Sequence, residues 1–140
     1  MVNYDIVNYD IVAEDLCERL GLNEDLVYEF VLSLLPCIVL FDKKQHDYGS
    51  GNIAQFGDLG VLIRINDKVQ RLKTLLMSGE EPKFSEEGLK DTWMDIAVYG
   101  VIGYMCHQGM WPDAYSAVEA MKARQPIPTG IIGESSGPSQ

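Results

Sequence analysis

The sequence has few basic residues: its 140 residues include 11 Lys and Arg against 21 Asp and Glu, and the formal net charge is −10 at pH 7. Proteins that bind nucleic acid without sequence preference neutralise phosphates with clustered Lys and Arg. The shortage of basic residues therefore argues against direct nucleic-acid binding. The acidity is compatible with a cation-binding site and equally with an ordinary solvated surface.

Cysteines and long apolar runs are also scarce. Cys17, Cys37 and Cys106 form no CxxC or Cys/His spacing, which argues against a structural zinc site, and their apolar surroundings are typical of reduced core residues. The longest apolar stretches, Val31–Phe41 and Ile96–Cys106, are too short to span a bilayer. The N-terminus shows no signal-peptide pattern. We therefore expect a cytoplasmic protein with no membrane partner.

Helical periodicity accounts for most of the chain, and no convincing strand pattern is present. Asn23 is the expected N-cap of the second helix, and Pro36 is expected to kink or divide it. Asp42–Asn52 is polar and contains Gly49 and Gly51, so it is expected to be a loop. The expected helices cover roughly residues 12–20, 24–41, 59–77, 86–107 and 112–124, with a core-facing stripe of Leu62, Ile65, Val69, Leu72 and Leu76.

These elements predict an all-α fold, a bundle of four or five helices. A single helical domain is expected over residues 1–124. Residues 125–140 are rich in Pro, Gly and Ser and are expected to form a flexible tail.

Asp95 is the only formally charged residue between Trp93 and Cys106. A helix that is apolar on all sides is buried in a core or between subunits, and a buried carboxylate needs a partner. Asp91 lies one turn earlier on the same face, roughly 6 Å away. Two carboxylates at this separation favour a bound cation such as Mg²⁺ or Mn²⁺.

An ion pair is the alternative to a metal, and the spacing leaves both open. The preceding predicted helix carries three basic residues that could reach Asp95, namely Arg64, Lys68 and Arg71. It also carries Asp67, which lies either on a solvated face or, if the two helices pack antiparallel, beside the other two acids as a third carboxylate. In the second arrangement the basic residues would lie near the phosphates of a bound ligand.

The polar segment from Lys43 to Asn52 has groups that suit a nucleotide. Lys43 and Lys44 could hold a triphosphate as point charges, and Tyr48 could stack on a base. The segment contains no Walker-type GxxxxGK[ST] motif. A solvated loop is therefore the alternative.

Three motifs in a fixed order carry a family resemblance: KKxxDYG at 43–49, RxxDKxxRL at 64–72 and DTxxDIAxY at 91–99. Together they resemble phage and bacterial proteins of the nucleotide-modification-associated type, which are similar to MazG-like all-α nucleoside triphosphate pyrophosphohydrolases. The resemblance covers roughly residues 38–105. It implies a homodimer or homotetramer with sites near subunit interfaces.

The implied activity is hydrolysis of a (deoxy)nucleoside triphosphate to the monophosphate and pyrophosphate, with Mg²⁺ or Mn²⁺ as cofactor. One implied substrate is (d)GTP in a viral nucleotide-modification pathway. The resemblance assigns the metal-binding and catalytic roles to Asp67, Asp91 and Asp95. The nucleotide-binding residues that it implies are Lys43, Lys44, Asp47, Tyr48, Asn52, Arg64, Lys68, Arg71 and Tyr99.

The chain also departs from the acidic motifs of that family. The EExxE register falls on Asn66, Asp67 and Gln70, of which one is acidic. The acids of the second motif, Asp91 and Asp95, are four rather than three residues apart. The reduced set of acids leaves open a non-catalytic nucleotide-binding protein or a helical interaction module.

Overall fold

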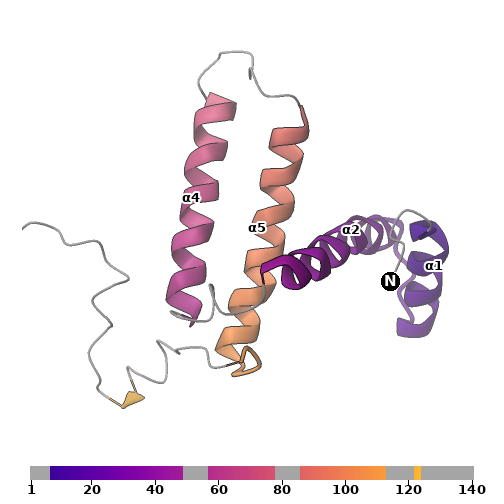
Figure 1. The fold of residues 1–140 in the computed structure, drawn as a ribbon. Coiled ribbons are helices and arrows are strands. Elements are labelled where there is room, and N and C mark those ends of the chain that lie inside the picture. The colour runs from indigo at the N-terminus through magenta and orange to yellow at the C-terminus, as the bar shows by residue number, and fades with distance from the viewer. Residues whose placement is uncertain (1–6, 49–56, 78–85, 113–121, 124–140) are drawn as a thin grey trace, which may run out of the picture. The chain divides into compact units, whose positions relative to one another are not determined.

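Four helices make up most of what the structure describes. A computed structural model describes residues 7–48, 57–77, 86–112 and 122–123. Within these ranges there is no strand, which confirms the all-α prediction. The chain divides into two compact units, residues 1–47 and 48–140. The helices are α1 (Tyr9–Leu20), α2 (Asp25–Tyr48), α4 (Gly57–Met77) and α5 (Glu86–His107) (Figure 1).

Glycines end α1 and α5 with the same backbone motif. Gly21 has a φ of 68° and Gly109 a φ of 70°, a left-handed conformation that glycine adopts without strain. After α1, the backbone N–H groups of Gly21 and Leu22 donate to the carbonyls of Glu18 and Cys17. The same pair of bonds follows α5 around Gly109. These bonds satisfy carbonyls that a helix end would leave open, and they confirm the two predicted helix ends.

The helix starts differ slightly from the predicted ones. The Asn8 side chain caps α1, so this helix starts at Tyr9 rather than at Val12. In α2 the carbonyl of Glu24 accepts the first helical hydrogen bonds, so the cap falls one residue after Asn23. For α4 and α5 the predicted bounds agree with the structure to within two residues.

The helix α2 is longer than predicted. Pro36 lies inside it without dividing it. The helix continues to Tyr48, so the prediction of a loop is wrong over residues 42–48. That prediction depended on glycines that come after Tyr48, whereas the segment from Asp42 to Tyr48 contains no glycine or proline that would end a helix.

Within the first unit, a polar contact joins α1 and α2. The Tyr28 hydroxyl donates to the Asp10 carboxylate over 3.2 Å. Loss of hydration, this hydrogen bond and the nearby negative charges raise the pKa of Tyr28 above its ordinary value of 10.0. The buried apolar residues of these two helices are Ala13, Cys17, Leu35 and Cys37.

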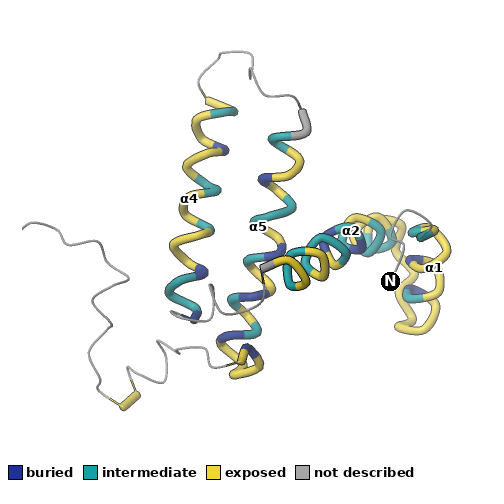
Figure 2. The backbone as a smooth tube through the Cα atoms, in the orientation of Figure 1, coloured by how far each residue is buried: buried dark blue, intermediate teal, exposed yellow. Residues whose placement is uncertain are grey.

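In the second unit, α4 and α5 lie side by side and run antiparallel (Figure 1). Buried positions recur at four-residue spacing at Gly57 and Val61 on α4 and at Val98, Ile102 and Cys106 on α5, which is a pattern of a helix–helix seam (Figure 2). A Cβ atom added at Gly103 would lie 3.4 Å from Val61 Cγ1, so α4 and α5 approach each other closely at this point. The buried residues of the seam include Gly57, Val61, Leu72, Thr92, Ile102 and Cys106.

The contact face of α4 lies to one side of the predicted apolar stripe. Leu72 is buried as predicted, but Leu62 and Leu76 are 60% and 57% exposed. Val61 and the half-buried Lys68 take the inward positions instead. The prediction was wrong for Leu62 and Leu76, because a count of apolar residues leaves out Lys68, whose place in the seam depends on a charged partner.

The three cysteines are free and buried, as predicted for core residues. Burial raises the pKa of the Cys37 and Cys106 thiols, and the negative charge of Asp58 adds to the effect at Cys106. None of the described helices is long and apolar enough to cross a membrane. Most of the predicted helix at 112–124 and all of the predicted tail lie outside the described residues.

Candidate functional site

One pair of predicted site residues meets across the α4–α5 seam. Lys68 Nζ lies 2.8 Å from Asp95 Oδ2, and the two side chains are 26% and 13% exposed. Among the basic residues considered as partners of Asp95, Lys68 makes this contact. The apolar surroundings of Asp95 required a partner, and in this structure a cation of the protein itself fills that role.

This ion pair lies between buried layers of the seam. Leu72 follows Lys68 by one turn, Thr92 precedes Asp95 by one turn, and both are buried. Buried Val61 lies on the other side of the pair along α4. Sheltering from water strengthens the attraction between the two charges, but removing them from water opposes it. The net contribution of the pair to stability is therefore smaller than its Coulomb attraction alone.

Thr92 has no site role among the sequence-based predictions, yet it is 2% exposed in the seam. Its hydroxyl donates to the Gly88 carbonyl one turn earlier, over 2.6 Å. A hydroxyl that is satisfied within its own helix can be buried at little cost. The signal that could have found Thr92 is its spacing of three residues from Asp95, which places both on one helix face.

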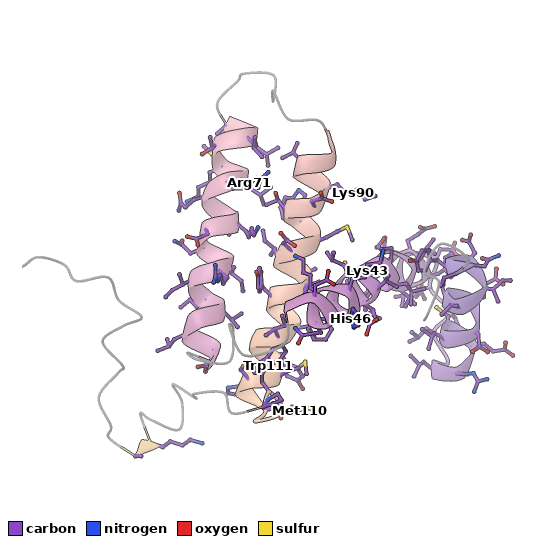
Figure 3. The ribbon with its side chains drawn as sticks, viewed as in Figure 1. Lys43, His46, Arg71, Lys90, Met110 and Trp111 are labelled. Atoms are coloured by element: carbon purple, nitrogen blue, oxygen red, sulfur yellow. The ribbon has the colours of Figure 1, made fainter. Side chains whose placement is uncertain are left out.

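Arg64 and Arg71 lie one turn before and one turn after Lys68 on α4, and both are exposed. Asp91 lies one turn before Asp95 on α5 and is also exposed. In an antiparallel pair of helices, we can start from two residues that face each other and count the same number of residues towards the N-terminus of each helix. The two residues reached in this way lie on the same side of the helix pair. Arg64, Arg71 and Asp91 therefore lie on the same side of the ion pair. We call these three residues, together with Lys68 and Asp95, the charged flank. Figure 3 labels Arg71 on α4 near the end of the hairpin where α5 begins.

The three acids predicted to hold a metal do not converge. Asp67 is exposed and lies next to Lys68 in the chain, so it points about 100° away from Lys68 around α4. Among the described residues, which include these three acids, no group of three or more His, Cys, Asp or Glu is placed to hold a metal ion. The donor set thus does not fit a preassembled Mg²⁺ or Mn²⁺ site, and the metal stays a prediction. Tyr99, one turn beyond Asp95, is half-buried.

The remaining predicted nucleotide-binding residues lie at or beyond the end of α2. Lys43, Lys44 and Asp47 are on its last turns, in the first unit. Lys43 and Asp47 are exposed and one turn apart, and Lys44 is half-buried. Tyr48 is the last residue of α2, and its side chain lies outside the described set, as does Asn52. The nucleotide-binding roles of these residues stay predictions.

Comparison with known proteins gives one family match. Residues 44–106 match the family described as nucleotide modification associated domain 1. The matched stretch contains the end of α2 and all of α4 and α5 to within one residue. No curated protein and no solved structure matches the chain. The family match indicates a role in nucleotide metabolism.

Proposed function

We propose that this chain binds a nucleoside triphosphate, whose phosphates contact the charged flank of the α4–α5 hairpin. The observation that carries this proposal is the row Arg64, Lys68 and Arg71 on one side of α4, within the stretch that matches a nucleotide-modification-associated family. The Lys68–Asp95 ion pair holds the middle of this row against α5. The two arginines on either side are exposed and can reach a ligand.

The local charge of α4 supports the proposal. In a chain with a net charge of −10, this helix has four basic residues and two acidic ones. A guanidinium group offers a planar fork of donors that matches two phosphate oxygens, so Arg64 and Arg71 suit a polyphosphate. The exposed carboxylate of Asp91 accepts hydrogen bonds and suits a sugar hydroxyl or a base N–H.

The second candidate function is hydrolysis of the bound triphosphate to the monophosphate and pyrophosphate. The observation that favours it is the pair of carboxylates on adjacent turns of α5, Asp91 and Asp95, in a motif order that resembles the MazG-like pyrophosphohydrolases. A preference for (d)GTP and a requirement for Mg²⁺ or Mn²⁺ belong to this second candidate. One experiment tests both functions.

The experiment titrates the purified full chain with each common NTP and dNTP, in Mg²⁺, in Mn²⁺ and in EDTA. Binding is read by calorimetry and by the shift of the melting temperature, and products are identified by anion-exchange chromatography. We expect at least one nucleotide to bind. A complete panel without binding in any of the three conditions contradicts the proposal, and binding without products rules out the second candidate.

Matched variants locate the binding site. We expect Arg64→Gln and Arg71→Gln each to weaken nucleotide binding by about tenfold, because each removes a charge-assisted hydrogen bond. Lys73 is an exposed cation of the same helix that lies away from the charged flank, so Lys73→Gln is the control and should change little. Equal losses in all three variants would indicate non-specific attraction instead of this site.

We also propose that the chain forms a homo-oligomer, as the family resemblance implies. Trp93, Val101 and Tyr104 on α5 are 56%, 51% and 64% exposed, and a second copy would shield them from water. Light scattering with size-exclusion chromatography tests this. A monomer across the accessible concentration range contradicts it and leaves the nucleotide-binding proposal unaffected.

A further inference from the structure

The Lys68 ammonium is held where a cation bound to Asp95 would sit. Its nitrogen lies 2.8 Å from Asp95 Oδ2, and both side chains are sheltered from water. Lys68 belongs to the contact face of α4, with buried Leu72 one turn after it and buried Val61 before it. These neighbours direct the side chain toward α5, so the contact follows from the packing of the two helices.

Asp91 strengthens this arrangement. It lies one turn before Asp95 on the same flank, and its exposed carboxylate adds negative potential around the ammonium. Two carboxylates on adjacent turns repel each other unless positive charge lies nearby. Lys68 supplies that charge from within the protein.

We infer that Lys68 is the built-in counter-cation of Asp95, so that wild-type protein binds the phosphates of its ligand without a divalent cation at this carboxylate. The inference rests on the proposed binding function for the ligand, and it is an alternative to the second candidate, in which a metal ion would contact Asp95. Its statement about Lys68 and Asp95 does not depend on any nucleotide. A divalent cation placed on Asp95 would lie beside an ammonium of the same sign, and binding would require Lys68 to leave the seam.

The inference predicts that removing the ammonium creates a metal site. Lys68→Met keeps the length and apolar stem of the side chain and removes its charge. Asp91 and Asp95 then need a new counter-cation, and Mn²⁺ prefers carboxylate oxygens. The test titrates the full-length protein with Mn²⁺ alone, in the absence of nucleotide, and follows the free Mn²⁺ signal by electron paramagnetic resonance.

We expect Lys68→Met to bind Mn²⁺ at least about tenfold more tightly than wild type, because the like-charge repulsion is gone. The gain should disappear in Lys68→Met/Asp95→Asn. Two controls should match wild type: Lys68→Arg, which keeps the charge, and Lys73→Met, which removes an exposed charge of α4 away from the site.

Two results would overturn the inference. One is Mn²⁺ binding by the wild type that Asp95→Asn abolishes, a comparison that does not depend on Lys68→Met folding. The other is a folded Lys68→Met protein, judged by circular dichroism, that gains no Mn²⁺ affinity. Nucleotide binding is recorded separately. Absence of binding in Mg²⁺, in Mn²⁺ and in EDTA would count against the proposed function alone, whereas binding of inorganic tripolyphosphate that requires Mn²⁺ and is lost in Asp95→Asn would also count against the inference.

Discussion

The two units of the chain hold their helices together in different ways. In the α4–α5 unit, residues such as Val61 and Ile102, which are 1% and 2% exposed, form a seam that also encloses an ion pair. In the α1–α2 unit, the contact between the helices includes an exposed hydrogen bond from Tyr28 to Asp10. A partner enclosed in a seam is costly to remove, because the group left behind stays away from water, whereas a partner at the surface is readily replaced by solvent.

Within α4–α5, the seam also divides into an apolar part and a charged part. The part of the seam around Val61 and Ile102 is apolar and serves packing. The part around Lys68 and Asp95 encloses charges beside exposed arginines, which packing alone does not require. Substitutions ordered by their expected effect test this division.

The largest effect is expected for Ile102→Ala. Removing a side chain that is 2% exposed leaves a cavity in the seam, and we expect a loss of roughly 2–5 kcal/mol in the free energy of unfolding. Both tryptophans, Trp93 and Trp111, belong to the second unit, so their fluorescence in urea reports on that unit by itself. A loss below about 1 kcal/mol would mean that the seam is not the core of this unit.

An intermediate effect is expected for Asp95→Asn. It leaves the Lys68 ammonium sheltered from water without its carboxylate partner, which should lower the free energy of unfolding by about 2 kcal/mol. Breaking a fully buried ion pair lowers it by more. Lys68→Met/Asp95→Asn should recover part of that loss, since no unmatched charge then remains. Asp67→Asn is the exposed control and should change stability by less than about 0.5 kcal/mol. If the changes in unfolding free energy of Lys68→Met and Asp95→Asn simply add up in the double variant, the two side chains have no interaction energy with each other.

A smaller effect is expected for the glycines of α5. Nothing lies within 4 Å of a Cβ atom added at Gly100, so Gly100→Ala should stabilise the helix by up to about 1 kcal/mol. Gly103→Ala should stabilise it less, because the new methyl group meets Val61 at 3.4 Å. Urea titration of the two variants side by side measures the difference. A larger gain at Gly103 would contradict the close approach of α4 and α5 at that point.

The smallest effect is expected for Tyr28, and it depends on pH. The pKa of Tyr28 is raised above 10.0, so its protonated form is favoured in the folded state. The contribution to stability is therefore fully present below pH 10 and is lost as pH rises through the raised pKa. Tyr28→Phe should lack this pH dependence, which circular dichroism melts from pH 8 to pH 11 would detect. Identical pH profiles would show that the contact with Asp10 does not stabilise the fold.

Much of the local structure followed from the sequence. The bounds Glu86–His107 and the end of the first helix at Leu20 were predicted from short-range signals that act within one or two turns, and in the structure Gly21 and Gly109 follow these helix ends. The loop predicted from Asp42 was wrong because short-range signals act locally. The glycines that suggested the loop come after Tyr48 and do not end the helix before that residue.

The sequence by itself determined where α4 and α5 lie and that Asp95 needs a partner, because helix formation and the cost of a sheltered carboxylate depend on local pattern and burial. Only the tertiary structure shows that Lys68 contacts Asp95. The spacing left metal and ion pair as equal alternatives; the register of α4 against α5 places Lys68 Nζ 2.8 Å from Asp95 Oδ2, and the metal stays a prediction. That register is set by packing around Val61 and Gly103, which lie far apart in the sequence.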